Sequence, residues 1–368
     1  MIIDRIEAIP LGIPFKPGNR SEAAAWGDKN LAVADSLLVK ITAGDGLVGW
    51  GETFGFGVVP SAKLAIDRMI APLCVGQDAA QIAPLMLDVQ KKLQVFGRSG
   101  PVMYGVSAID MALWDLAGKA ASQPVHRLLG GSRKTRLPCY ASLIRYADPA
   151  LVRANVRRAV DAGFRSLKLH EIELPAIRAA REAAGPDVEI ALDVNCAWSL
   201  DEARSHAATL REFGLRWLEE PVWPPENFEG LAELRSTASI PIAAGENAST
   251  LMEFDRLMAA GAVNFVQPSP AKMGGITELA KIAAIAAARN VTLMVHTFYD
   301  GPGLLAAIHT TAALGSAASM VEWRYFDLEA QLYGSLMPVD GHIPVPQGPG
   351  LGLEPDQDVI RTYTLRIA

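Results

Sequence analysis

The sequence is poor in cysteine. Its 368 residues include only three, which are scattered along the chain at Cys74, Cys139 and Cys196. An odd number of scattered cysteines gives no sign of a disulfide framework or of a cysteine-based metal site, and it suits a reducing compartment. We therefore expect a cytoplasmic protein.

Long apolar runs and basic clusters are also missing. The longest apolar stretch in a predicted helix, residues 282–288, is far shorter than the roughly 20 residues that cross a membrane. The first residues mix charged with apolar side chains and contain no signal-peptide core. The net charge of −6, without any Lys/Arg cluster, gives no basic field for nucleic acid. We expect neither a membrane nor a nucleic-acid partner.

The sequence does contain a repeat. Between residues 168 and 322, short apolar runs end in polar residues, and a helix-like stretch of roughly two dozen residues follows each run. The run-ending residues are Lys168 with His170, Asp193, Glu219, Glu246, Ser269, His296 and Glu322. From His170 onward the steps are 23, 26, 27, 23, 27 and 26 residues, about one strand-loop-helix-loop unit each. The strand ends of a parallel barrel meet at one mouth, so these polar side chains are expected around one substrate.

The first 130 residues do not follow this period. Strand-like residues 37–42 and 47–52 flank Asp45-Gly46, a strong hairpin signal. Helical patterns follow at residues 61–73, 84–95 and 103–119. Residues 362–367 are again strand-like. We therefore expect an α+β capping domain at residues 1–130, a barrel at 131–330 and a C-terminal segment, 331–368, that returns to the capping domain.

Three acidic residues on successive strand ends indicate a metal site. Asp193, Glu219 and Glu246 would place three carboxylates around one point, where their repulsion needs a cation. Any one of them could instead cap a helix or close a surface ion pair. A set of oxygen ligands without cysteine selects a hard cation, and Mg²⁺ fits best. Glu220, the neighbour of Glu219, is expected to face away.

Basic side chains flank the predicted metal site. Lys168 and His170 lie on one side and His296 on the other, although His296 alone could be an ordinary core histidine. A nearby divalent cation would lower the pKa of Lys168 toward a useful range. Such a site can remove a proton α to a carboxylate, because the metal stabilises the developing charge and Glu322 could hydrogen-bond the other oxygen.

Several short motifs carry a family resemblance. They are residues 106–115, 128–131, 193–195, 217–221, 245–247, 274–277 and 348–352. The motifs around Asp193, Glu219 and Glu246 are similar, in order, to the three metal-ligand motifs of the enolase superfamily and its mandelate racemase subgroup. The resemblance covers nearly the whole chain. It implies an α/β fold in which a capping domain covers a modified TIM barrel, (β/α)7β, with Mg²⁺, a small-molecule carboxylate substrate and a homo-oligomeric state.

Two positions depart from the family pattern. The second barrel strand often ends Lys-x-Lys in the family, whereas this chain has Lys168-Leu169-His170. The sixth strand usually supplies an Asp that pairs with the seventh-strand histidine, and here that position is Ser269. A serine cannot stabilise an imidazolium as a carboxylate does, so His296 is expected to serve as an acid rather than a base. Asp300 could replace the missing Asp, and Lys272 is interpreted as a loop lysine.

The substrate-covering loops are expected to be apolar. The resemblance places residues 53–60, which include Phe54, and a second loop with Trp26 over the mouth, although either loop could pack into the domain interface. Asn195 and Asn247, each beside a predicted ligand, are candidate substrate contacts. A distal carboxylate or hydroxyl group could bind Arg20, Arg145 or Arg324.

These features predict an enzyme that needs one competent base. The first hypothesis is a hydro-lyase that dehydrates an acid sugar, with Lys168 as the base and His296 or His170 as the acid. A racemase, epimerase or lactone cycloisomerase is the alternative, and it would need bases on both faces of the substrate. A non-catalytic metal-dependent scaffold that binds a carboxylate is a third possibility, which only Ser269 supports.

Overall fold

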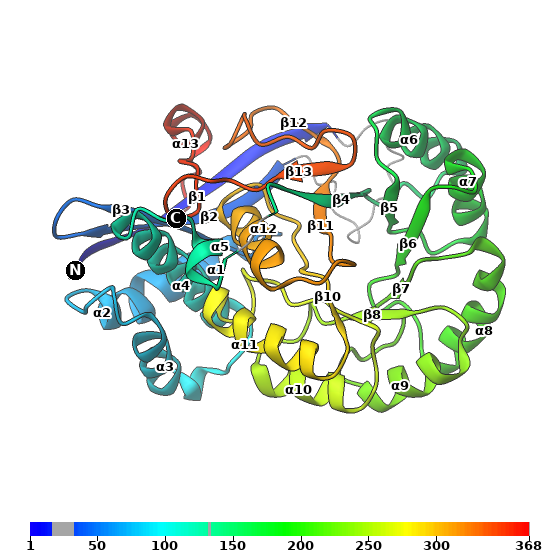
Figure 1. The fold of residues 1–368 in the computed structure, drawn as a ribbon, viewed down its shortest axis with the longest axis horizontal. Helices are drawn as coiled ribbons and strands as arrows, with labels where there is room; N and C mark the ends of the chain where they lie inside the picture. Colours follow the sequence, from blue (N-terminus) through cyan, green and yellow to red (C-terminus); the bar gives the residue numbers. More distant parts are fainter. Residues whose placement is uncertain (17–32, 132–133, 368) are drawn as a thin grey trace.

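The computed structural model describes residues 1–16, 33–131 and 134–367. Its strands form two sheets, and most of the second sheet consists of the parallel strands that the repeat predicts. Figure 1 shows the barrel helices curving around this second sheet, while the N-terminal helices and both chain ends lie at the other end of the molecule. None of the described helices is both long and apolar enough to cross a membrane.

The N-terminal sheet is antiparallel. It contains β1 (Ile3–Lys16), β2 (Val33–Ala43) and β3 (Val48–Thr53), and β12 (Asp327–Leu328) pairs with the other edge of β1. The predicted hairpin joins β2 to β3, where Gly46 has a φ of 86° that favours glycine. One strand of this sheet therefore comes from the far end of the barrel sequence.

Helices cover one face of this sheet. They are α1 (Val59–Ala65), a π-helical turn (Ile66–Ile70), α2 (Ala71–Cys74), α3 (Ile82–Lys92), α4 (Gly100–Ala120) and α5 (Val125–Leu128). The long helix α4 packs directly on β3, because a Cβ at Gly49 or Gly51 would collide with backbone atoms of α4. The apolar helical spacing of residues 103–119 correctly predicted this buried helix.

Eight parallel strands form the barrel. They are β4 (Arg136–Ser142), β5 (Ser166–Leu169), β6 (Glu189–Asp193), β7 (Leu218–Glu219), β8 (Ile242–Ala244), β9 (Phe265–Val266), β10 (Thr292–Leu293) and β11 (Val321–Arg324). Neighbours follow chain order from β4 to β10, and β11 lies beside β4. The helices after the first seven strands are α6 (Pro149–Asp161), α7 (Leu174–Ala184), α8 (Leu200–Leu210), α9 (Phe228–Thr237), α10 (Leu251–Ala259), α11 (Gly275–Ala288) and α12 (Pro302–Leu314). This order confirms the (β/α)7β prediction.

Side chains on the barrel strands alternate as predicted. Leu167, Leu169 and Leu192 point outward into the large core between strands and helices. The interior holds a separate small cluster, made by Tyr140, Ala191, Trp217, Ala243, Met294 and Met320. The barrel below its mouth is therefore packed and mostly apolar, and the polar residues gather at the carboxyl ends of the strands.

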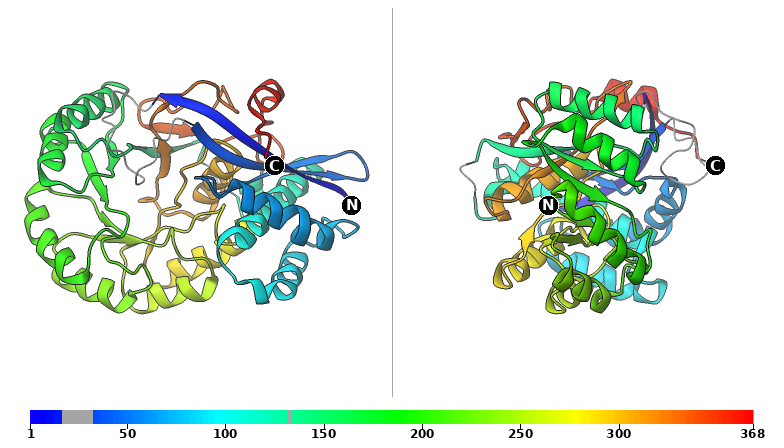
Figure 2. Two further views of the ribbon diagram at one scale, coloured as in Figure 1. Left: turned by 180° about the vertical axis from the view of Figure 1, so that it is seen from behind. Right: turned by 90° about the vertical axis from the view of Figure 1, so that its right-hand side faces the viewer.

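The C-terminal residues lie against both sheets. β13 (His342–Pro344) pairs antiparallel with β4, and the red C-terminal helix α13 (Gln357–Tyr363) lies beside the N-terminal strands in both Figure 1 and Figure 2. The predicted strand at residues 362–367 is wrong. Asp356 caps α13 by accepting from the N–H groups of Asp358 and Val359, so the helix continues to Tyr363 and leaves only one bridge, between Leu11 and Thr364.

Candidate active site

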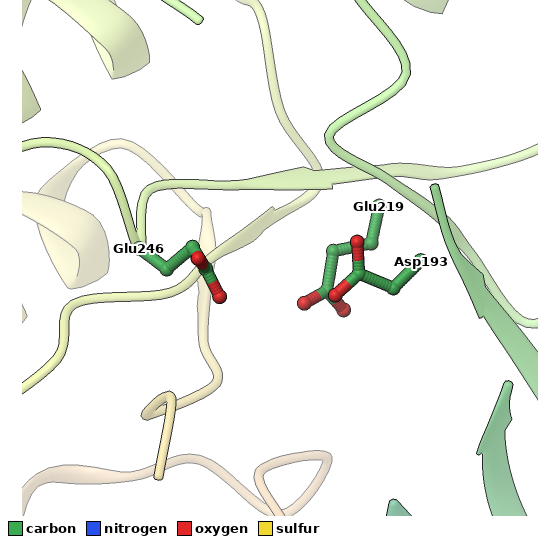
Figure 3. Close-up of side chains that lie close together, drawn as sticks. All are labelled: Asp193, Glu219 and Glu246. Carbon is green, nitrogen blue, oxygen red and sulfur yellow. The ribbon is translucent and has the colours of Figure 1, made fainter. Parts of the chain in front are cut away.

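Three carboxylates meet at the barrel mouth. Asp193 and Glu219 are the last residues of β6 and β7, and Glu246 lies two residues beyond β8. One oxygen from each lies within 4.8 Å of the others. Figure 3 shows the carboxylates of Asp193 and Glu219 side by side, with that of Glu246 facing them from its own loop. The backbone turns sharply just past two of these ligands, with positive φ at Asn195 (48°) and Glu220 (43°).

A buried lysine lies among these carboxylates. The Nζ of Lys168 is 2.8 Å from Glu219, 2.8 Å from Glu322 and 3.3 Å from Asp193. Burial alone would lower the pKa of Lys168, but Glu219, Glu322 and Asp193 raise it well above its ordinary value. The lysine is therefore a buried ammonium group that balances part of the acidic charge.

The acidic residues respond differently to this crowding. Burial raises the pKa of Glu219 to about 7. The positive charge of Lys168 acts to lower this pKa, but the negative charges of Asp193 and Glu322 oppose it. Burial also opposes the charged form of Asp193, but Lys168 and His170 hold the pKa of Asp193 well below its usual range. Three oxygen donors with so much negative charge and no sulfur fit a hard divalent cation such as Mg²⁺. Asp193, Glu219 and Glu246 would hold it.

Two histidines approach the carboxylates from different strands. The Nε2 of His170, just after β5, is 3.4 Å from Asp193, and its Nδ1 donates to the carbonyl oxygen of Leu143. The Nε2 of His296, after β10, is 2.8 Å from Glu246. Burial would lower the pKa of His296, but Glu246 and Glu322 raise it. His296 therefore holds its proton more firmly than an exposed histidine does.

Ser269 does not take the place of the family Asp. Its hydroxyl hydrogen-bonds the hydroxyl of Tyr299, and the Nδ1 of His296 has no hydrogen-bond partner among the described residues. Asp300 does not replace the Asp either, because it forms an ion pair with Arg324. Among the residues that the structure describes, His296 has carboxylates at Nε2 only.

Lys272 contacts the site, although the sequence suggested only a loop lysine. It lies in the turn after β9, as expected, but its side chain is buried. Its Nζ is 3.8 Å from Glu246, 3.4 Å from the side-chain oxygen of Asn247 and 4.7 Å from the ring centre of Phe54. Lys272 thus links the apolar loop of the capping domain to a predicted metal ligand.

The four predicted substrate contacts have different surroundings. The ring of Phe54 contacts the Nζ of Lys272 near the mouth. The backbone N–H of Asn195 donates to Asp193 at 2.9 Å. The side-chain amide of Asn247 donates to Glu220 at 2.8 Å. Trp26 lies outside the described residues, as does Arg20.

Sequence reasoning missed the burial of Glu220 and two further neighbours of the site. Glu220 is buried, and burial with the nearby charge of Glu246 raises its pKa well above the usual value. The indole N–H of Trp217 donates to Glu219 at 2.8 Å. The hydroxyl of Tyr140 is buried inside the barrel without a partner among the described residues. The alternation rule could have found Trp217, which lies two residues before the ligand and faces the same way.

Comparisons with known proteins agree with the fold and the motifs. Residues 29–130 match the family model "Mandelate racemase / muconate lactonizing enzyme, N-terminal domain", and residues 151–359 match "Enolase C-terminal domain-like". Arabinonate dehydratase of Saccharolobus solfataricus is 32% identical, over 94% of this chain and 95% of that protein.

Solved structures agree as well. The 3,6-anhydro-D-galactonate cycloisomerase of Zobellia galactanivorans has a TM-score of 0.87 at 31% identity and covers 100% of both chains. A mandelate racemase/muconate lactonizing protein of Paracoccus denitrificans, complexed with magnesium, has a TM-score of 0.85 at 32% identity and covers 99% of this chain and 98% of that one. The chain therefore belongs to the enolase superfamily, within its mandelate racemase and muconate lactonizing enzyme group.

Proposed function

We propose that this protein is a Mg²⁺-dependent hydro-lyase that removes the proton α to the carboxylate of an acid sugar and expels the β-hydroxyl group as water. The observation that carries the proposal is the cluster of Asp193, Glu219 and Glu246 beside Lys168, with a histidine on either side. Arabinonate dehydratase, which matches nearly the full length of this chain, supports the choice of reaction.

The contacts favour a division of labour among the basic residues. Lys168, held by three carboxylates, suits the binding of a negatively charged substrate better than the removal of a proton. His170 donates through Nδ1 to a carbonyl oxygen, so its Nε2 is the nitrogen that can accept the α-proton. We therefore assign the base to His170, in place of Lys168, and keep Lys168 as the residue that orients the substrate.

His296 completes the reaction from the other side. Its Nε2 faces Glu246, which favours the protonated ring, so it can give a proton to the departing hydroxyl group. Glu322 accepts the backbone N–H of Thr297 at 3.0 Å and lies 2.8 Å from Lys168, and these contacts support a position beside the substrate carboxylate. When bound, Mg²⁺ supplies positive charge that stabilises the negative charge developing on the substrate.

An isomerase is the second candidate. The similarity to a 3,6-anhydro-D-galactonate cycloisomerase favours it, as does the position of His296 opposite His170. It would return a proton to carbon or close a ring instead of losing water. A non-catalytic scaffold is less well supported, because a buried lysine and two histidines at a carboxylate cluster are costly without a chemical task.

The test is incubation of the protein with Mg²⁺ in D₂O against a library of acid sugars and other α-substituted carboxylates. Loss of water, seen as a 2-keto-3-deoxy acid, would support the hydro-lyase. Deuterium at the α-carbon with inverted configuration would favour the isomerase. Retention of every α-proton would contradict both reactions. His170→Ala is expected to stop the exchange. Lys168→Met is expected to weaken substrate binding.

We further propose a cytoplasmic homo-oligomer. The three free cysteines, two of them buried, and the family resemblance support this proposal. Light scattering on the purified protein is expected to give a mass that is a multiple of the 39.3 kDa chain.

A further inference from the structure

A small cavity lies between the N-terminal sheet and the barrel mouth. Its walls combine aromatic rings with charged side chains from both parts of the chain. The residues that matter here are Glu52, Asp35, Phe298, Tyr299, Asp300 and Arg324. Ligand sites commonly have this character, in which apolar walls surround a few polar groups that fix the orientation of the ligand.

Arg324 is the polar centre of this cavity. It follows Glu322 by two residues on β11, so it points the same way and lies roughly 6.6 Å further along the strand. Its guanidinium lies 4.5 Å from the ring centre of Phe326 and 5.5 Å from that of Phe298, and it forms an ion pair with Asp300. The side chain is 7% exposed, and its Nε has no hydrogen-bond partner among the described residues.

Two aromatic rings of the cavity wall lie next to the proposed catalytic histidines. The ring of Phe298 lies 6.2 Å from that of His170, and the ring of Tyr299 lies 6.1 Å from that of His296. A substrate whose carboxylate lies at the metal ligands would therefore extend its carbon chain along these rings toward Arg324. Because the cavity is small, only the far end of such a chain would enter it.

The charges around Arg324 are already balanced. Asp300 pairs with the guanidinium, and Asp35 accepts the N–H groups of Phe56 and Gly57 at 2.7 Å each. Glu52 accepts the N–H of Gly303 at 2.9 Å, and burial raises the pKa of Glu52 to about 7. The described residues of the cavity thus offer an N–H donor and carboxylate acceptors without excess positive charge.

We propose that this cavity is the distal subsite for the substrate of the proposed reaction, and that it selects acid sugars whose far end is a neutral hydroxyl group over diacids with a second carboxylate. A hydroxyl group can donate to Asp300 and accept from Arg324. Among the described residues that line the cavity, a second carboxylate would face Asp300, Asp35 and Glu52 with Arg324 as the one cation, and its desolvation would be poorly compensated. This inference rests on the proposed function, because that function places the substrate carboxylate at the metal ligands.

The test compares matched ligands by calorimetry on the Mg²⁺-loaded protein. The probes are five- and six-carbon sugar monoacids, the diacids of the same stereochemistry, and glycerate, which is too short to reach the cavity. We expect the best monoacid to bind at least about 10-fold more tightly than its matching diacid. Equal or tighter binding of the diacid would overturn the proposal, as would binding of no probe.

Two substitutions then locate the selectivity. Arg324→Leu is expected to weaken the monoacid about 10-fold or more while changing glycerate little. Asp300→Asn frees the charge of Arg324, so the preference is expected to shift about 10-fold toward the diacid. An equal loss for glycerate and the long monoacid, or an unchanged preference in Asp300→Asn, would contradict a distal subsite.

Matched controls separate this result from general damage. Arg289 and Asp255 form an exposed ion pair at 2.7 Å, so Arg289→Leu and Asp255→Asn should leave every probe unaffected. If Arg324→Leu does not fold, the double variant Arg324→Gln with Asp300→Asn removes both charges together and should weaken the monoacid but not glycerate.

The same probes, followed for α-deuterium exchange, keep the two proposals apart. Selective monoacid binding without exchange would contradict the proposed function and leave the subsite standing. Exchange together with tighter binding of the diacid would contradict the subsite and leave the proposed function standing.

Discussion

Two buried histidines in this protein have opposite surroundings. His296, at the barrel mouth, lies 2.8 Å from Glu246, and its pKa is raised although burial opposes the charge. Within the described part of the chain, the ring of His309, where α12 meets α5, bonds only His126 at 3.1 Å and the carbonyl oxygen of Leu351 at 3.0 Å, and burial lowers its pKa to about 4. Because both rings are buried, their neighbours decide which of them carries the charge. The mouth gathers charged groups around His296, whereas the surroundings of His309 keep its ring neutral.

Removing a charge at the mouth should cause the strongest loss of activity. Glu246→Gln takes away a predicted metal ligand and the partner of His296, so turnover should fall at least about 10³-fold, or roughly 4 kcal/mol in the barrier. Steady-state kinetics at saturating Mg²⁺ measures it. Glu253→Gln is the control, since Glu253 caps α10 and should cost stability of about 1 kcal/mol without such a loss of turnover. Full activity in Glu246→Gln would show that charge at the mouth is not needed.

The neutral histidine should make folding sensitive to acid. The pKa of His309 falls from its ordinary 6.5 to about 4 in the folded protein, so the unfolded chain binds more protons between these values. Its contribution to stability is complete above pH 6.5 and should be lost as the pH falls toward 4, by about 3 kcal/mol in total.

Denaturant unfolding of the wild type and of His309→Gln across this window measures the effect as a difference in slope. The variant should lose stability less steeply with acid. Identical slopes would mean that His309 is already charged in the folded protein, and the contrast with His296 would disappear.

A smaller effect, on Mg²⁺ affinity, is expected at Trp217 inside the barrel. Trp217→Phe keeps an aromatic ring but removes the donor to Glu219, so Mg²⁺ affinity should fall about 10- to 100-fold. Titration of the metal-free protein with Mg²⁺ measures it. Trp114→Phe removes a similar bond to Thr277 away from the mouth and should leave Mg²⁺ affinity unchanged. Equal affinities in both variants would argue that the bond to Glu219 does not position the ligand.

The smallest effect is expected at the position of the missing carboxylate. The hydroxyl of Ser269 bonds Tyr299 instead of His296, so Ser269→Ala should change turnover less than about 10-fold, the value of one hydrogen bond. A loss near that of Glu246→Gln would mean that Ser269 supports His296 during the reaction.

Much of the fold followed from the sequence because one periodic signal determined it. The alternation of Leu167, Lys168 and Leu169, repeated on later strands, indicated which side chains face the axis, and the three carboxylates appear where the spacing placed them. The prediction of a strand at residues 362–367 was wrong because the helix cap at Asp356 outweighed their strand propensity.

Contacts made by loops could not be predicted in this way. Lys272, in the turn after β9, contacts Phe54 of the capping domain, and Arg324 pairs with Asp300 in the segment after β10. The pairing of Asp300 with Arg324 likewise depends on how the segment after β10 meets β11. Such contacts link segments without a shared period, so spacing alone carries no information about them.

We propose that the carboxylate cluster holds a metal that makes the α-proton removable. The most direct test follows α-proton exchange in D₂O with the best substrate, first with Mg²⁺, then with excess chelator, and then with Mg²⁺ restored. We predict that exchange stops on chelation and returns with the metal. Exchange that continues at the same rate in the chelator would contradict the claim.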